Sequence, residues 1–317
     1  MIKYVCQRVV LMLVTFFIIM FACFALIRML PLPVLDPGDV HGQIAQLRRE
    51  AMGYEKPIIE QFVIFIKGLF TRWDWGVSDK LYLGQDVWAL FVDKLPPTVL
   101  TNLYSIILAI PLGILLGIVA ALKKNSGVDH FISTSTMIFI SVPSFVYASL
   151  VQYFLCFKLG WFPLIMKTGR NYWDWNMFLS MVPAVLSLSF GVIAGFTRTT
   201  RAELTEVLTS EFMLLARTKG LTKMQTTVRH ALKNCMVVVL PSIFGEFINI
   251  MSGSLIIEQI FSIPGVGKLY LNSINAPDYP LFLLLSCFYL AIGLVAGIVV
   301  DISYGFIDPR IRMGSRK

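Results

Sequence analysis

The sequence predicts an all-α membrane protein that crosses the bilayer six times. Of its 317 residues, 56% are apolar and only 15% are charged, a balance far from that of a soluble domain. Six apolar runs are each long enough to cross about 30 Å of hydrocarbon as a helix. None of them alternates in polarity as the strand of a membrane barrel does. A bundle of membrane-spanning helices is therefore the expected fold class.

The expected spans are 9–30, 103–122, 131–157, 177–197, 235–257 and 281–300. Arg28 lies near the end of the first and Glu246 lies in the fifth, whereas the other four hold no charged residue. The first run is too long for the core of a secretory signal, and no small-x-small cleavage site follows it. This pattern indicates an uncleaved first span.

The basic residues predict that both chain termini lie in the cytoplasm. With the N-terminus inside, the cytoplasmic segments hold fifteen Lys and Arg residues and the two short outer segments hold four. The net charge of +8 then reflects membrane topology, so no nucleic-acid partner is needed to explain it. The five cysteines have no paired spacing and the three histidines do not cluster, so neither a disulfide framework nor a metal site is expected.

The outer segment between the first two spans is expected to contain a helix. Pro57 suits a first helical position, and apolar residues follow it at helical spacing as far as Phe70. Trp73 and Trp75 come next, and such aromatic residues suit the headgroup level. Two interpretations remain open: an interfacial helix that anchors the loop, or a platform for an external partner.

The cytoplasmic loop 198–234 is expected to form a helix-turn-helix. Apolar residues at three-and-four spacing indicate two short amphipathic helices, and Gly220 between them can adopt the left-handed conformation that ends a helix. Thr222 and Gln225 have the spacing of a capping box for the second helix. Attachment to two spans argues against a DNA-reading role. An anchor to acidic lipid stays an alternative, although the apolar turn 216–221 suits a protein cleft better.

Gly265-Val-Gly-Lys268 looks like the end of a phosphate-binding loop. However, Ser262 stands where the first glycine of such a loop belongs, and Leu269 stands where a Ser or Thr should hold magnesium. The predicted topology also places this segment outside, away from cytoplasmic ATP. We therefore expect a tight outer turn, followed by a re-entrant or capping loop that ends near Pro280.

Several motifs, taken together and in order, resemble one known family. They are Asp74-Trp-Gly-Val-Ser78, Leu95-Pro-Pro-Thr98, Ala216-Arg-Thr-Lys-Gly-Leu221, Arg229-His-Ala-Leu-Lys-Asn234, Glu258-Gln-Ile-Phe-Ser-Ile-Pro-Gly-Val-Gly267 and Asp308-Pro-Arg-Ile-Arg312. The likeness spans nearly the whole chain. The chain is similar to the B-type permease subunits of the oligopeptide and dipeptide (peptide/nickel) ABC importers.

This resemblance implies a type I ABC importer (MetI-like) transmembrane domain over 99–317 with a coupling loop at 198–234. It follows an N-terminal segment and first span over 1–30 and an outer loop over 31–98. A second permease as a heterodimeric partner, two ATP-binding subunits and an extracytoplasmic solute-binding protein are also implied, in a bacterial or archaeal cytoplasmic membrane. The chain itself would then be non-catalytic and bind no cofactor, because its partner subunits use ATP and Mg²⁺.

The resemblance also suggests residue roles. Gly220 would set the coupling turn, Ala216 and Leu221 would fill a cleft in the ATPase, and the charged or docking residues would be Arg217, Lys219, Arg229 and His230. In the fifth span, Ser242, Glu246 and Asn249 share one helix face and are candidates for the translocation pathway, since a charge in a span usually faces a water-filled cavity. Glu258, Pro264, Gly265 and Gly267 would form an outer loop or gate, where glycines permit close backbone approach to another subunit.

Oligopeptides are the expected substrate, with dipeptides, glutathione or nickel and other metal chelates as alternatives within the family. An ion-coupled secondary transporter would need charged relays or broken helices in two matched halves, and the sequence has no internal repeat. A membrane-embedded hydrolase would need a nucleophile or zinc motif, and neither Gly-x-Ser-x-Gly nor His-Glu-x-x-His occurs.

Overall fold

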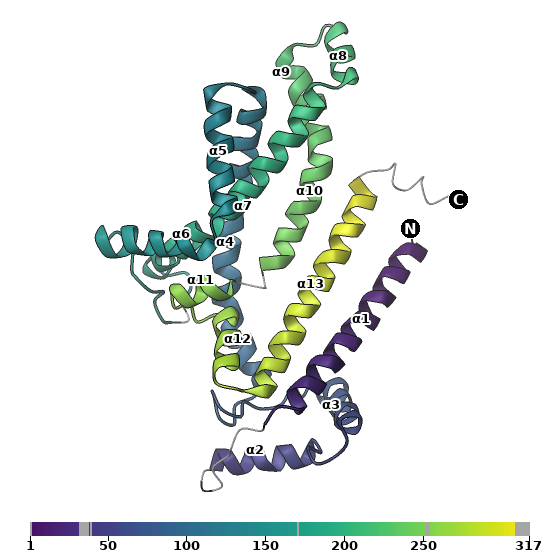
Figure 1. Ribbon diagram of the computed structural model, residues 1–317, viewed down its shortest axis with the longest axis vertical. Helices are drawn as coiled ribbons and strands as arrows, with labels where there is room; N and C mark the ends of the chain where they lie inside the picture. Colours follow the sequence, from purple (N-terminus) through teal and green to yellow (C-terminus); the bar gives the residue numbers. More distant parts are fainter. Residues whose placement is uncertain (1, 32–37, 39, 170, 251–253, 308–317) are drawn as a thin grey trace. The chain divides into compact units, whose positions relative to one another are not determined.

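The computed structural model describes residues 2–31, 38, 40–169, 171–250 and 254–307, and these form an almost entirely helical chain (Figure 1). An isolated bridge between Val77 and Asp86 is the one β-type pairing in these ranges. The helices are α1 (Ile2–Arg28), α2 (Val40–Ala51), α3 (Ile58–Arg72), α4 (Val87–Leu122), α5 (Gly127–Ser141), α6 (Ser144–Val151), η1 (Gln152–Lys158), α7 (Trp175–Leu208), α8 (Glu211–Thr218), α9 (Lys223–Thr226), η2 (Thr227–Ala231), α10 (Leu232–Asn249), α11 (Leu255–Ile260), α12 (Val266–Asn275) and α13 (Tyr279–Ile307).

Five helices of the described chain are long and apolar enough to span a membrane. They are Val5–Arg28, Val87–Leu122, Trp175–Leu208, Met224–Ile248 and Tyr279–Ser303. A sixth span results if the bent pair Gly127–Ser141 and Ser144–Lys158 counts as one. The multi-pass helical membrane fold is therefore confirmed.

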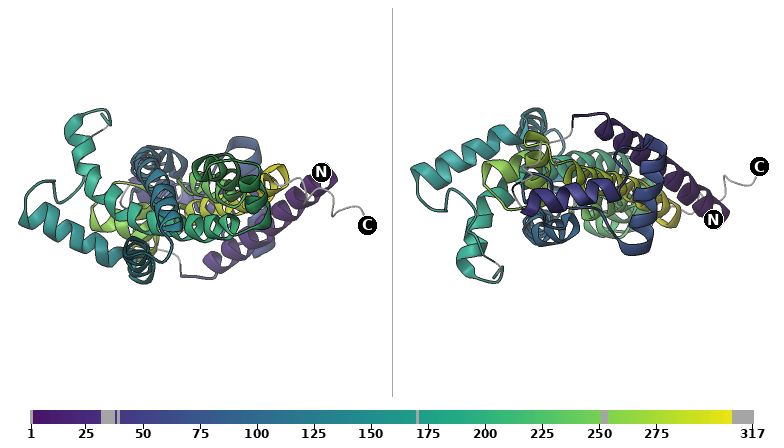
Figure 2. Two further views of the ribbon diagram at one scale, coloured as in Figure 1. Left: turned by 90° about the horizontal axis from the view of Figure 1, so that it is seen from above. Right: turned by 90° about the horizontal axis from the view of Figure 1, so that it is seen from below.

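The span expected over 131–157 is not one straight helix, because the chain bends by 102° between α5 and α6. Pro143 follows the bend, and a proline pushes the preceding residue out of the helical region and donates no backbone hydrogen bond. Val142 is accordingly extended, with φ −84° and ψ 128°. Figure 2 shows α6 and η1 running sideways from α5.

The expected fifth span, 235–257, is also interrupted. Helix α10 ends at Asn249, and Ser254 precedes a separate helix, α11. The Ser254 hydroxyl accepts a hydrogen bond from the Ile257 backbone N–H at 3.4 Å, as a residue that starts a new helix does. The residues between, 251–253, lie outside the described ranges.

Contacts divide the chain into two compact units. The first comprises 1–99, 251–259 and 263–295, and the second comprises 100–250, 260–262 and 296–317. In the first unit, the α3 side chains Phe65 and Leu69 are buried in one cluster with Phe24 of α1 and Leu283 of α13. The helix predicted after Pro57 thus exists, and one of its faces packs against two membrane spans of its own unit.

In the second unit, α7 packs closely along α4. A Cβ atom added to Gly117 would lie 2.8 Å from the Thr197 carbonyl oxygen, and one added to Gly113 would lie 2.8 Å from that of Ile193. Glycines one turn apart permit such close approach of two membrane helices. The Thr197 hydroxyl donates to the Gly113 carbonyl at 3.1 Å and ties the two backbones together.

A buried ion pair joins α5 to α7 in the same unit. Asp129 is fully buried and accepts hydrogen bonds from Arg201 Nε at 2.5 Å and Arg201 Nη2 at 2.8 Å. The Asn125 N–H and the Ser133 hydroxyl donate to the same carboxylate at 2.9 Å and 3.2 Å. This bidentate pair fixes the start of α5 against α7.

Candidate functional site

The coupling loop has the local geometry that its sequence predicts. Gly220 has φ +86°, in the left-handed region, directly after α8. The Thr222 N–H donates to Gln225 Oε1 at 3.1 Å, and the Gln225 N–H donates to Thr222 Oγ1 at 3.2 Å. This reciprocal pair is a capping box, and the helical segment that it starts continues through α9 and η2 into α10. The end of a membrane span is thereby joined stiffly to the turn.

The side chains of the loop divide into buried and exposed sets. Met213 and Ala216 face inward, with 1% and 8% of their surface exposed. Ala216 is therefore covered by its own chain, and Leu221 is half-buried. Lys219, Arg229 and His230 are exposed as expected. The side chain of Arg217 lies outside the described ones.

Large apolar side chains of the loop that were not among the expected coupling residues are exposed. We call this set the coupling patch: Phe212, Leu214, Leu215, Met224 and Val228, each 43–71% exposed. They lie on α8, α9 and η2, the helices that precede and follow the Gly220 turn. Helical spacing indicates an apolar face on each short helix, and the folded loop shows that these five side chains are not covered by the chain itself.

The pathway candidates lie beside an open pocket in the second unit. A pocket of about 290 Å³ is lined by Ser242 and Glu246 of α10 and by the α7 residues Gly191, Gly195 and Thr199. Glycines at two successive turns of α7 leave this wall without side chains. Ser242 is exposed and Glu246 is half-buried, which brings these two predicted residues together; the side chain of Asn249 lies outside the described ones.

The sequence suggested that Glu246 lies in the middle of a span, but the structure places it near the end of one. Helix α10 ends at Asn249, so the carboxylate stands within one turn of the helix end. The reason is the interruption before α11, which apolar composition does not mark. A carboxylate at such a position can meet water more easily than one at mid-helix.

The outer loop encloses a buried carboxylate of the first unit. Glu258 is 2% exposed; its side chain accepts hydrogen bonds from the Thr98 hydroxyl at 2.8 Å and from the Lys268 N–H at 3.0 Å. The Thr98 hydroxyl oxygen in turn accepts from the Val266 N–H at 2.8 Å. Burial raises the pKa of Glu258 to about 7, while the N–H groups of Lys268 and Gly267 and the Thr98 hydroxyl act in the opposite direction.

This arrangement explains why the Gly265-Val-Gly-Lys268 segment looks like a phosphate-binding loop. Helix α12 begins at Val266, and backbone N–H groups at a helix N-terminus favour an anion. A Cβ at Gly265 would lie 2.4 Å from Glu258 Oε2, and one at Gly267 would lie 3.0 Å from Glu258 Cδ. The glycines thus admit the chain's own carboxylate. Both glycines are buried, and within this chain the group that approaches them is the Glu258 carboxylate. Thr98, which donates to the same carboxylate, was not singled out from the sequence.

Comparisons with known proteins agree on one family. A family model described as the binding-protein-dependent transport system inner membrane component matches residues 113–313. The dipeptide transport system permease protein DppB of Lactococcus lactis subsp. cremoris is 33% identical, covering 99% of this chain and 100% of that protein. The oligopeptide transport system permease protein OppB of Escherichia coli K12 is 31% identical, covering 98% of this chain and 100% of that protein.

Solved structures show the same fold. A chain of the MetNI methionine ABC transporter in inward-facing conformations matches with a TM-score of 0.52 and 16% identity, over 68% of this chain and 97% of that one. A chain of an amino acid ABC transporter matches with a TM-score of 0.51 and 17% identity, over 68% of this chain and 94% of that one.

Proposed function

Because this chain belongs to the family of binding-protein-dependent transport system inner membrane components, we propose that it forms half of a peptide pathway across the cytoplasmic membrane. A second permease would supply the other half, as the sequence resemblance implies. The relatives that match over their full length are named as dipeptide and oligopeptide permeases. Oligopeptides remain our proposed substrate, with dipeptides as the second candidate because one of these relatives is a dipeptide permease.

The observation that carries the mechanism is the exposed coupling patch on a capped, rigid turn. Large apolar side chains grouped on a surface mark a site of interaction with another protein. We propose that an ATP-binding subunit covers the patch, and that the basic residues around it, Lys219 and Arg229, contact acidic groups of that subunit. Met224 is 71% exposed and is the most exposed apolar residue of the patch, so we assign it the cleft-filling role expected for Ala216 and Leu221.

A rigid turn transmits motion to the spans that it joins. The second helix of the loop is continuous with α10, which carries Ser242 and Glu246. Movement of the docked subunit during its ATP cycle would therefore move the pathway wall. ATP and Mg²⁺ would act in the partner subunits, and an extracytoplasmic solute-binding protein would deliver the peptide. A carboxylate at Glu246 would attract the positively charged amino terminus of that peptide.

Co-purification tests the docking role. The chain is expressed with tagged ATP-binding subunits and without its second permease, which would otherwise hold it on the tag. Met224→Asp is expected to abolish recovery of the membrane chain, since burying an unpaired charge in an interface costs several kcal/mol. Ile59→Asp on α3, where the native side chain is 69% exposed, is the matched control and should co-purify normally. Full recovery of the Met224→Asp chain would contradict the proposed docking surface.

A further inference from the structure

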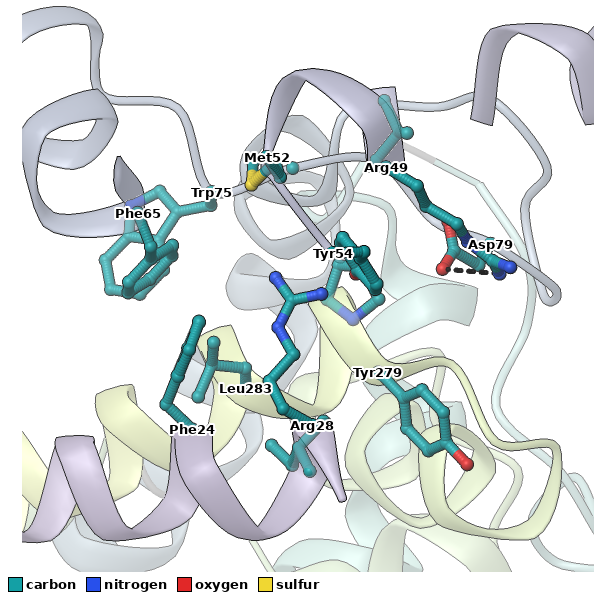
Figure 3. A pocket seen from close by; sticks show the side chains of 14 residues that line it. Phe24, Arg28, Arg49, Met52, Tyr54, Phe65, Trp75, Asp79, Tyr279 and Leu283 are labelled. Carbon is teal, nitrogen blue, oxygen red and sulfur yellow. Dashed lines mark hydrogen bonds and ion pairs between the residues drawn. The ribbon is translucent and has the colours of Figure 1, made fainter. Parts of the chain in front are cut away.

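A pocket in the first unit lies beside the outer end of the first span and is lined by aromatic and charged side chains (Figure 3). Its cavity volume is about 40 Å³. The aromatic rings come from α1, α3, α13 and the segments after α2 and α3: Phe24, Phe65, Tyr279, Tyr54 and Trp75. Two guanidinium groups, Arg28 and Arg49, and one carboxylate, Asp79, complete its polar lining.

The two arginines differ in their partners. Arg49 Nη2 lies 3.2 Å from Asp79 Oδ2, with side chains 10% and 4% exposed, so these two charges offset each other. Arg28 instead lies over aromatic rings, with Cζ 3.4 Å from the Tyr54 ring centre and 4.8 Å from that of Phe24. Its Nη1 atom is buried and has no hydrogen-bond partner among the described residues. In Figure 3 the Arg28 guanidinium reaches beside the Tyr54 ring.

A second acid of this region, Asp278, interacts with Asp79. Its carboxylate is fully buried and accepts hydrogen bonds from the Ser78 hydroxyl and from the backbone N–H groups of Leu81 and Lys80, at 3.0 Å and 3.2 Å for the N–H groups. The indole Nε1 of Trp75 in the pocket lining is another buried donor without a partner in the described chain. Arg28 interacts electrostatically with Asp79, but its Nη1 atom and the Trp75 Nε1 atom find no acceptor in the described chain. Two such donors lining one pocket favour an anion, because buried donors without acceptors are costly.

An apolar surface leads from the pocket along the first span. Rings of α1 pair with rings of α3 in succession: Phe24 with Phe65 at 5.4 Å, Phe21 with Phe62 at 5.0 Å and Phe17 with Phe70 at 6.4 Å between ring centres. Phe17, Phe21 and Phe70 are at least 37% exposed. Such a surface suits an acyl chain rather than a free ion. Arg28 ends the span Val5–Arg28, at the depth where phosphate headgroups lie.

We propose that this pocket binds the phosphodiester headgroup of one anionic phospholipid at Arg28, with an acyl chain along the ring pairs of α1 and α3. The guanidinium provides a charge-assisted hydrogen-bond donor for the phosphate. Tyr54 and Phe24 hold the guanidinium in place by their contacts with its face.

The test uses the full-length chain, purified and stripped of lipid in a neutral detergent. Native mass spectrometry then follows the retention of added phosphatidylglycerol, phosphatidylcholine or inorganic phosphate. We expect one phosphatidylglycerol per chain, retained at least tenfold more strongly than phosphatidylcholine. Arg28→Gln should remove this preference, whereas Arg72→Gln, at the exposed end of α3, is the matched control and should keep it.

Three results would overturn the proposal. Equal retention of the two lipids by the unmodified chain would exclude recognition of the anionic headgroup, whether or not the variants fold. Unchanged preference in a folded Arg28→Gln chain would place the lipid elsewhere. Saturation of the site by inorganic phosphate at the same concentration as the lipid would show that a free anion is the ligand.

Discussion

Among single residues, Glu258 is a deeply buried carboxylate whose protonation can be tested by experiment. Its carboxylate is 2% exposed, and hydrogen bonds from α4 and α12 hold it. Thr98 and Glu258 are 160 positions apart in the chain. The sequence motif that contains Glu258 and Gly267 therefore cannot predict the hydrogen bond between Thr98 and Glu258. The Glu258 side chain of α11 thus links α4 and α12 in the first unit.

The raised pKa of Glu258 predicts a pH-dependent stability. Between the ordinary value of 4.5 and the folded value of about 7, the folded chain holds a proton that the unfolded chain has lost. The free energy of unfolding should therefore fall as pH rises across this window, by about 1.4 kcal/mol per pH unit at most, and level off above it. Melting temperature measured in detergent at a series of pH values gives the profile.

Glu258→Gln is the variant for this experiment. The amide is uncharged at every pH, and its oxygen can still accept from Thr98, so the decline across the window should disappear. Glu60→Gln is the control, because Glu60 lies in the first turn of α3 and is exposed. This substitution should leave the decline of stability with pH intact. A Glu258→Gln chain that declines as steeply as the unmodified chain would assign the effect to another group.

At the scale of elements, the close contact of α4 with α7 depends on two glycines. Gly117→Ala should lower the free energy of unfolding by about 1–3 kcal/mol, because the new methyl group would meet backbone atoms that cannot move away cheaply. Gly195 on α7 is the matched control: a Cβ there meets no atom within 4 Å. Gly195→Ala should be neutral or stabilising by up to about 1 kcal/mol, through helix propensity. Thermal unfolding in detergent compares the two variants.

Equal melting temperatures for the two glycine variants would contradict the close packing of α4 on α7. The two variants are matched, because both substitutions add the same methyl group to a helix of the second unit. The difference between them isolates the backbone contact at Thr197 from the general effect of replacing a glycine.

The coupling turn is the second element with a specific prediction. Gly220→Val should uncouple ATP hydrolysis from uptake while leaving the chain in the membrane, because a β-branched residue at φ +86° is strained by about 1–3 kcal/mol and would rebuild the turn. Gly220→Asn should remain coupled, since asparagine tolerates the left-handed region. No atom lies within 4 Å of a Cβ at this position, so conformation rather than space is tested. The ratio of peptide taken up to ATP hydrolysed, measured in proteoliposomes, decides the outcome; an unchanged ratio in Gly220→Val would contradict the role of the turn.

For the whole molecule, local signals in the sequence predicted local structure well. The capping box of Thr222 and Gln225 and the left-handed Gly220 follow from rules that act within four residues. The helix after Pro57 followed from its apolar spacing. Helix α2 was missed because its twelve residues, VHGQIAQLRREA, include few large apolar side chains.

Long-range features of the molecule could not be predicted in this way. The chain stays apolar on both sides of Pro143, so apolar composition alone does not predict the 102° bend between α5 and α6. Burial of Ala216 and exposure of Met224 depend on how α8 packs against α9, which helical periodicity does not determine. Likewise, the two glycines of the outer loop were recognised as sites of close approach, but the group that approaches them comes from within the chain.

The central claim is that this chain works only as part of an ATP-driven importer. The direct measurement is uptake of a labelled oligopeptide into proteoliposomes that contain the chain, its second permease and the ATP-binding subunits, with the solute-binding protein outside and ATP inside. We predict ATP-dependent accumulation by the complete assembly and none when any one component, including this chain, is left out. Accumulation by this chain alone, or uptake driven by an ion gradient without ATP, would contradict the account.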